Sequence, residues 1–137
     1  MACSSCGDKT VLIVDDSEFD LMPLEAILTG MCGVEVEQAN GGQEAIDKFK
    51  ADRAKSCCST RFKLVFMDVN MPGIDGLEAT RQVMAANDGS VLKVVGVTSF
   101  ESDEAIQRCL DAGMCAIVSK PVNVVRLKAA FQSYYTQ

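Results

Sequence analysis

The sequence predicts a doubly wound α/β fold in which five parallel strands form one sheet covered by five helices. Short apolar runs rich in β-branched residues recur along the chain, for example at residues 10–14 and 64–67, and such runs are typical of strands buried on both faces. Segments with helical spacing of apolar residues separate these runs, and alternating strands and helices build parallel sheets through right-handed crossovers. The 137 residues have the length of one domain.

The first expected strand covers residues 10–14 and leads into a helix. Ser17 or Asp20 can cap that helix, and Pro23 favours the later start because proline is tolerated in a first turn but disrupts a helix interior. Residues 34–37 alternate apolar and acidic side chains, which predicts a half-exposed strand at the edge of the sheet. The predicted core face of the helix consists of Leu21, Leu24, Leu28 and Met31.

A second helix is expected after this edge strand. Asn40 and Gln43 have the spacing of a capping box, and the helix continues through Ile46 and Phe49. Residues 51–62 are then predicted to form a long polar connection to the central strand.

The central strand is expected at residues 64–67 and ends on Asp68. A proline and two glycines within residues 72–76 predict a loop, and a third helix begins near Asp75. A turn signal at residues 87–89 ends this helix. Its predicted core face consists of Leu77, Thr80 and Met84.

The last two strands are expected at residues 91–97 and 115–118. Ser102 can cap the helix between them, and Gly113 is placed as its C-terminal stop. Asn123 can cap the final helix. The apolar faces of these helices are Ala105, Ile106, Cys109 and Leu110, followed by Leu127, Ala130, Phe131 and Tyr134.

The charge balance argues against a nucleic-acid partner. The chain has 13 Lys and Arg against 19 Asp and Glu, a net charge of −6, whereas phosphate neutralisation needs clustered basic side chains. No apolar run approaches the ~20 residues of a membrane span, and residues 1–8 lack the apolar core of a secretory signal. We therefore expect a cytoplasmic protein without membrane contact, with a flexible tail at residues 1–8 and one domain at residues 9–137.

The chain has seven cysteines and no histidine, and we expect the cysteines to be reduced thiols. Cys3 and Cys6 have C-x-x-C spacing, but the tail offers neither the strand-to-helix context of a redox site nor two further zinc ligands. Cys57 and Cys58 fall in the predicted polar connection, where thiols are open to oxidation.

Polar side chains stand at the C-terminal ends of four expected strands. Because parallel strands end at the same edge of a sheet, where open α/β sheets bind ligands, we expect these side chains to lie together. Three carboxylates repel one another unless a cation joins them, and oxygen ligands without histidine favour Mg²⁺, with Mn²⁺ as a substitute. An acidic metal site beside a lysine and a hydroxyl suits a phosphoryl group. The residues are Asp15, Asp16, Asp68, Thr98 and Lys120.

The chain resembles the receiver domains of response regulators in two-component phosphorelays, and the stand-alone chemotaxis type in particular. The resemblance covers about the whole chain after the tail and is carried by residues 14–16, 67–76, 98–99 and 120–121 in this order. It implies a flavodoxin-like (β/α)5 fold with strand order 2-1-3-4-5. It also implies a signalling domain rather than an enzyme, with self-catalysed phosphoryl transfer and slow autodephosphorylation only.

The resemblance implies a role for each residue that faces the phosphoryl group. Asp68 would accept the group from a phosphohistidine, forming an aspartyl phosphate. Lys120 would pair with the phosphoryl oxygens, and Thr98 would move to donate a hydrogen bond to them. The Lys120–Pro121 peptide bond is expected to be cis by the same analogy.

For the metal, the resemblance implies a set of oxygen ligands. Asp16 would bind Mg²⁺ directly and Asp15 largely through water. Asp68 would contribute a carboxylate oxygen, and Asn70 would contribute its backbone carbonyl.

The expected partners are a histidine kinase or a His-containing phosphotransfer protein as phosphodonor, and a downstream effector protein. Ile117 stands where many family members carry a Tyr or Phe that turns inward with the threonine, so the output surface is expected to switch differently or more weakly. The alternative is therefore a pseudo-receiver, a protein-interaction module without regulated phosphorylation. A haloacid-dehalogenase-like phosphatase ranks last, because Asn70 stands where that class carries a second Asp.

Overall fold

The computed structural model describes residues 9–54, 61–87, 92–99 and 102–135. The predicted tail, both cysteine pairs, the end of the turn at 87–89 and the predicted start of the fourth strand at 91 lie outside these residues. The strands are β1 (Val11–Val14), β2 (Val36–Ala39), β3 (Leu64–Asp68), β4 (Lys93–Thr98) and β5 (Ala116–Ser119). The helices are α1 (Glu18–Gly30), α2 (Gly42–Ala54), α3 (Gly76–Ala86), α4 (Asp103–Ala112) and α5 (Val124–Tyr134).

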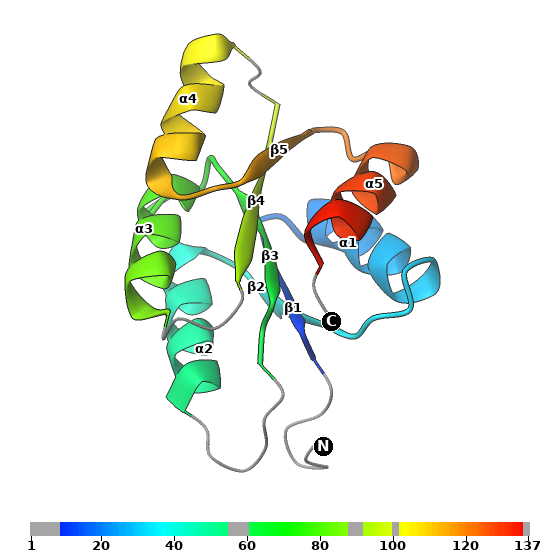
Figure 1. Cartoon of the computed structure of the whole chain (residues 1–137), viewed down its shortest axis with the longest axis horizontal. Coiled ribbons are helices and arrows are strands. Elements are labelled where there is room, and N and C mark those ends of the chain that lie inside the picture. The colour runs from blue at the N-terminus through cyan, green and yellow to red at the C-terminus, as the bar shows by residue number, and fades with distance from the viewer. Residues whose placement is uncertain (1–8, 55–60, 88–91, 100–101, 136–137) are drawn as a thin grey trace.

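The five strands form one parallel sheet in the order β2-β1-β3-β4-β5, which confirms the predicted fold class and strand order. Helices α1 and α5 cover one face of the sheet, and α2, α3 and α4 cover the other (Figure 1). Since all strands run in the same direction, their C-terminal ends meet at one edge, and β1 and β3 lie side by side there.

Successive strand residues face opposite layers, so the sheet has two separate cores. Leu12 packs toward α2 with Phe49, and Ile13 packs toward α1 and α5 with Phe66 and Leu127. All five side chains are fully buried. Burying one such side chain contributes roughly 1.5–3 kcal/mol, so the two cores hold the sheet edge rigidly.

The predicted caps Ser102 and Asn123 and the predicted stop Gly113 are confirmed, and Asp75, near which α3 was expected to begin, is also a cap. The side-chain oxygens of Asp75, Ser102 and Asn123 accept backbone N–H groups from the first turns of α3, α4 and α5 at 2.8 to 3.2 Å. Gly113 ends α4 with a φ of 116°, a conformation that side chains other than glycine rarely adopt.

Helix α1 starts earlier than predicted. Ser17, not Asp20, is the residue before it, and the backbone oxygen of Ser17 accepts the N–H groups of Asp20 and Leu21, each at 3.1 Å. Pro23 therefore lies inside the helix. Because proline has no N–H, one carbonyl of the exposed first turn lacks a helical hydrogen-bond donor. Water can donate to that carbonyl instead. The earlier start leaves the Asp20 side chain available for another partner.

Strand β2 lies further along the chain than the predicted segment at residues 34–37. Its last residue, Ala39, accepts the N–H of Asp15 at 3.2 Å, so pairing with β1 continues toward the end of that strand. The residue before α2 is Gly41 rather than the predicted cap Asn40. Side-chain alternation alone could not locate this strand, because Val34 and Val36 both contribute to the same core.

Helix α2 extends into the predicted polar connection at residues 51–62. The Asp52 carboxylate is 2.8 Å from the Arg53 guanidinium and accepts the N–H of Phe62 at 3.0 Å. The Arg53 guanidinium also donates to the Phe62 carbonyl at 3.1 Å. This buried ion pair ties the last turn of α2 to the chain entering β3, which extends the helix through polar residues.

Three residues predicted on apolar helix faces are exposed instead. The exposed fractions are 58% for Met31, 37% for Met84 and 42% for Leu110. All three lie near the C-terminal end of a helix. For Met31, the reason is length: α1 has 13 residues and is about 20 Å long, whereas the four-residue β1 is about 13 Å long, so the end of α1 extends past the strand. Ile27 and Val83 are buried where the predicted faces omitted them.

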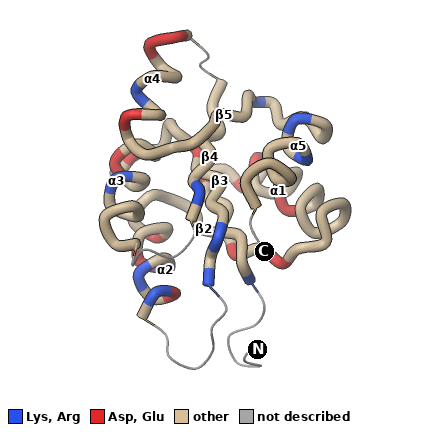
Figure 2. The backbone as a smooth tube through the Cα atoms, viewed as in Figure 1, with Lys and Arg blue, Asp and Glu red and all other residues tan. Residues whose placement is uncertain are grey.

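Charged side chains are distributed over many elements. Figure 2 shows Lys and Arg on α2, α3, α4 and α5 and at the starts of the central strands, rather than gathered on one element. Within the described parts of the chain, no helix is both long and apolar enough to cross a bilayer.

Candidate functional site

The C-terminal edge of the sheet brings together residues from four strands. Asp68 and Thr98 are the last residues of β3 and β4, Asp15 follows β1, and Lys120 follows β5. The register pairs Asp68 with Val97, so neighbouring strand ends lie level with each other. These four side chains and Asp16, which follows Asp15, are the five that the sequence predicted to share an edge, and they do so.

Three carboxylates form a compact acidic cluster at this edge. One oxygen from each of Asp15, Asp16 and Asp68 lies within 4.8 Å of the others. Asp15 and Asp68 are buried, whereas Asp16 is exposed. The N–H of Ser17 donates to Asp15 at 2.9 Å and orients one of its oxygens. The cluster thus combines two desolvated carboxylates with one that solvent reaches.

Lys120 lies among these carboxylates. Its Nζ is 2.9 Å from Asp15, 3.1 Å from Asp20 and 3.2 Å from Asp68. Burial alone lowers the pKa of Lys120, but hydrogen bonds to Asp15 and Asp20 and the nearby charges outweigh it and raise that pKa. The lysine is therefore a fixed positive charge beside Asp68. The preceding segment is held by a hydrogen bond from the Lys120 N–H to the Thr98 carbonyl at 2.9 Å, and the Lys120–Pro121 bond is cis as expected.

Burial and repulsion perturb the carboxylates themselves. Burial, followed by the charge of Asp15, raises the pKa of Asp68 to about 6, although Lys120 opposes the shift. Burial also raises the pKa of Asp15. The ionised form of Asp68 is therefore disfavoured, and additional positive charge beside the pair would stabilise it.

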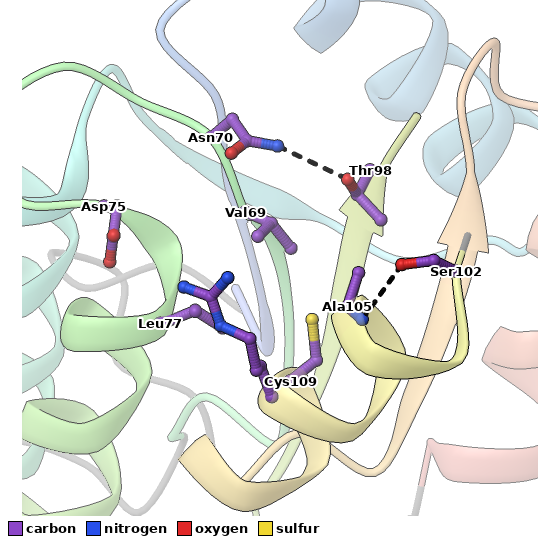
Figure 3. A pocket seen from close by; sticks show the side chains of 9 residues that line it. Val69, Asn70, Asp75, Leu77, Thr98, Ser102, Ala105 and Cys109 are labelled. Atoms are coloured by element: carbon purple, nitrogen blue, oxygen red, sulfur yellow. Dashed lines mark hydrogen bonds between the residues drawn. The ribbon is translucent and has the colours of Figure 1, made fainter. Parts of the chain in front are cut away.

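Asn70 and Thr98 complete the edge on the side away from Asp15. The backbone N–H of Asn70 donates to an Asp68 carboxylate oxygen at 3.3 Å, and its side-chain amide donates to the Thr98 hydroxyl at 3.5 Å (Figure 3). Thr98 is buried, and Asn70 is exposed in the loop after β3. The Thr98 hydroxyl thus lies at the end of β4, the strand next to β3, which ends at Asp68.

Gly76 allows α3 to start directly against the end of β3. Its N–H donates to the Val69 carbonyl at 2.9 Å. A Cβ at this position would collide with the backbone carbonyl of Asp68 and approach Val69 Cα to 2.8 Å. The sequence marked Gly76 only as a loop residue, whereas the structure requires glycine there for close packing.

A cavity of about 310 Å³ opens beside Asn70 and Thr98, between the starts of α3 and α4 (Figure 3). Val69, Leu77 and Cys109 contribute apolar surface to it. Asn70 and Thr98 line both this cavity and the edge beside Asp68, so space is present next to the hydroxyl.

Ile117, on β5, packs into the core under α3 and α4 rather than facing solvent. It is partly buried, and its Cδ1 lies 2.9 Å from where a Cβ on Gly96 would stand, beside the sulfur of Met114. The glycine in β4 therefore provides the space that the isoleucine occupies.

The donor set fits a hard divalent cation. Among the described residues, the acidic cluster offers carboxylate oxygens, and two of its three carboxylates are desolvated by burial. The raised pKa of Asp68 shows that its ionised form is destabilised, and a bound cation would remove this cost. Asp15, Asp16 and Asp68 are the residues that would hold Mg²⁺.

Asp20 is a member of this site that the sequence analysis considered only as a helix cap. It lies in the first turn of α1 and reaches Lys120. No local pattern in the sequence indicates this contact, and only the tertiary structure shows it.

The fold and this edge define a class: doubly wound α/β domains that bind their ligand at the C-terminal ends of the strands. The chain belongs to the response regulator receiver domain family, whose model matches residues 11–132. It is thus a receiver domain of two-component signalling.

Sequence comparisons with two other proteins support this assignment. The osmosensing histidine protein kinase SLN1 of Saccharomyces cerevisiae is 33% identical over 90% of this chain, and the aligned region is 10% of that kinase. A protein-glutamate methylesterase/protein-glutamine glutaminase of Methanospirillum hungatei is 37% identical over 81% of this chain and 30% of its own length. The chain therefore spans a small part of these relatives.

Two solved structures are close matches in fold. Chemotaxis protein CheY4 of Vibrio cholerae superposes with a TM-score of 0.79 at 30% identity and covers 93% of this chain and 99% of its own. The receiver domain of the histidine kinase CKI1 of Arabidopsis thaliana, in complex with Mg²⁺, has a TM-score of 0.79 at 30% identity, with 91% and 90% covered.

Proposed function

We propose that this receiver accepts a phosphoryl group on Asp68 from a phosphohistidine, in a Mg²⁺-dependent reaction that changes its binding to other proteins. The observation that carries the proposal is the buried carboxylate of Asp68 at the end of β3, with the Lys120 ammonium at 3.2 Å. A nucleophile beside a fixed positive charge is the arrangement that phosphoryl transfer needs.

The reaction would use few protein groups. A carboxylate oxygen of Asp68 attacks phosphorus and forms the new P–O bond, while the P–N bond of the phosphohistidine breaks and its electron pair stays on the imidazole. Lys120 and the Thr98 hydroxyl donate hydrogen bonds to the phosphoryl oxygens. These contacts neutralise charge that would otherwise build up against Asp15 and Asp68.

The metal site would consist of oxygen ligands from the ends of β1 and β3 and the segments that follow them. Asp16 and Asp68 would bind Mg²⁺ directly and Asp15 largely through water, and the backbone carbonyl of Asn70 would complete the protein ligands. The bound ion supplies positive charge to the phosphoryl oxygens. Mn²⁺, with similar oxygen preferences, is expected to substitute.

The phosphodonor would be a protein, either a histidine kinase or a His-containing phosphotransfer protein. Support comes from α1, which begins next to the acidic cluster and exposes two large apolar side chains. The exposed fractions are 86% for Phe19 and 66% for Met22. Neighbouring exposed apolar side chains mark protein-binding surfaces, and this surface adjoins the acceptor.

The test is intact mass after incubation with acetyl phosphate, with and without Mg²⁺. We expect one phosphoryl adduct on the wild type and on Asp47→Asn, which removes an exposed carboxylate of α2, and none on Asp68→Asn. Omission of Mg²⁺ should abolish or strongly slow labelling of the wild type. Normal labelling of Asp68→Asn would refute the acceptor assignment, and no adduct under any condition would favour a pseudo-receiver.

A further inference from the structure

Lys120 is held by carboxylates from three different segments of the chain. Asp15 follows β1, Asp68 ends β3 and Asp20 lies in the first turn of α1. Asp15 and Asp68 are buried, whereas the side chain of Asp20 is 43% exposed. Asp20 therefore approaches the ammonium from the solvent side of the site.

The three carboxylates are not equivalent once a cation is considered. A lysine ammonium has three N–H donors, and here each has one carboxylate partner. Asp15 and Asp68 also belong to the acidic cluster that would hold a divalent cation, together with Asp16. Asp20 does not belong to that cluster, so its carboxylate remains available to Lys120 when a cation engages the other two.

We infer that Asp20 is a positioning residue that keeps the Lys120 ammonium beside Asp68 while the metal site is filled. The inference rests on the proposed function. A divalent cation repels Lys120 and takes over its two buried partners. A lysine side chain on a flexible four-carbon stem then needs a remaining anion to stay at the acceptor. Asp20 supplies it, at 3.1 Å from Nζ.

Two consequences separate this role from a purely structural one. Without Asp20, Lys120 is less often in place when the phosphoryl group arrives, so the maximal rate of phosphorylation falls. Of the carboxylates that contact Lys120 in the described parts of the chain, Asp15 and Asp68 then remain, so Lys120 competes more directly with the metal and weakens Mg²⁺ binding. Both effects require the ammonium contact, and neither follows from a change in fold stability alone.

The test compares Asp20→Ala, Asp20→Asn and Glu18→Gln. Glu18→Gln is the matched control, because it removes a negative charge from the same first turn of α1 at an exposed side chain. Asp20→Asn keeps an oxygen that accepts a hydrogen bond from Lys120 but removes the charge. The readout is the rate of adduct formation by mass spectrometry across acetyl phosphate concentrations, at saturating Mg²⁺.

We expect the maximal rate to fall about tenfold in Asp20→Ala, to fall less in Asp20→Asn and to stay at the wild-type value in Glu18→Gln. The final adduct stoichiometry should remain one per chain. Calorimetry should show a several-fold weaker Mg²⁺ affinity for Asp20→Ala and no change for Glu18→Gln.

An unchanged or faster rate in Asp20→Ala would overturn the inference, and so would an equal loss in Glu18→Gln. If Asp20 only stabilised the fold, Asp20→Ala would unfold at lower temperature and keep the wild-type rate per folded molecule. Failure of the wild type itself to label would instead refute the proposed function, so the two failures are distinguishable.

Discussion

Asp68 is placed by its strand in a position that is unfavourable for an isolated carboxylate. It is buried, it lies near Asp15, and both features raise its pKa to about 6. Lys120 offsets only part of this cost. The same features that make the ionised group unstable in the free protein suit it to gaining a phosphoryl group and a metal ion.

At the residue scale, we expect Asp68→Asn to stabilise the metal-free fold at neutral pH. The pKa of about 6 lies above the usual 3.8, so the ionised carboxylate destabilises the fold above pH 6, by about 3 kcal/mol. This cost shrinks as pH falls through 6 and is absent below about 4, where folded and unfolded chains both carry the proton.

Thermal unfolding in EDTA across this pH range measures the difference in stability between wild type and Asp68→Asn. Asp47→Asn, on the exposed surface of α2, serves as the control and should show no pH-dependent gain in stability. A lower melting temperature for Asp68→Asn at neutral pH would show that the carboxylate stabilises the fold instead.

At the element scale, the contact between the start of α3 and the end of β3 sets the position of Asp68, the proposed acceptor. We expect Gly76→Ala to displace this junction, because a Cβ there meets the Asp68 carbonyl, which is backbone and cannot rotate away. Overpacking of this kind costs about 1–3 kcal/mol. Thermal unfolding should show this loss, and adduct formation from acetyl phosphate should slow as well.

Gly41→Ala provides the comparison for this junction, since nothing lies within 4 Å of a Cβ at that position. It should cost much less stability than Gly76→Ala and leave labelling unchanged. Equal effects of the two substitutions would mean that general helix effects, not contact with Asp68, are responsible.

A second prediction at the element scale concerns helix α1. Replacing Phe19 by serine should slow phosphoryl transfer from a phosphorylated His-containing phosphotransfer domain about tenfold, because an exposed aromatic anchor is lost from the donor-binding surface. Transfer from acetyl phosphate should be unchanged, since a small donor needs no docking surface. Met31→Ser, at the opposite end of α1 and also exposed, is the control. Equal losses with both donors would place the defect in the site instead.

At the scale of the whole molecule, metal binding and stability are linked. A ligand that binds only the folded chain stabilises it by about 1.4 kcal/mol at ten times its dissociation constant. We therefore expect Mg²⁺ to raise the melting temperature by several degrees. The shift should be much smaller for Asp16→Ala, which removes an exposed ligand without emptying the core. A full shift in Asp16→Ala would contradict its role as a ligand.

The three-layer architecture, with helices on both faces of the sheet, explains how much could be predicted at this scale. Continuous apolar runs at β1 and β3 identified strands buried on both faces, and the polar residues after them identified the functional edge. Strand β2 was misplaced because an edge strand has a weaker pattern. Helix α2 was predicted too short because its last turn depends on the ion pair of Asp52 and Arg53, whose partner at Phe62 is distant in sequence.

The sequence by itself determined the order of elements, the helix caps Ser102 and Asn123 and the identity of the residues at the strand ends, because these depend on runs of neighbouring residues. Only the tertiary structure decided that Lys120 contacts Asp15, Asp20 and Asp68 together, and that Gly76 must be small. Lys120 and Asp20 are 100 positions apart. Their contact depends on strand register, on where α1 begins and on side-chain packing, none of which a local pattern encodes.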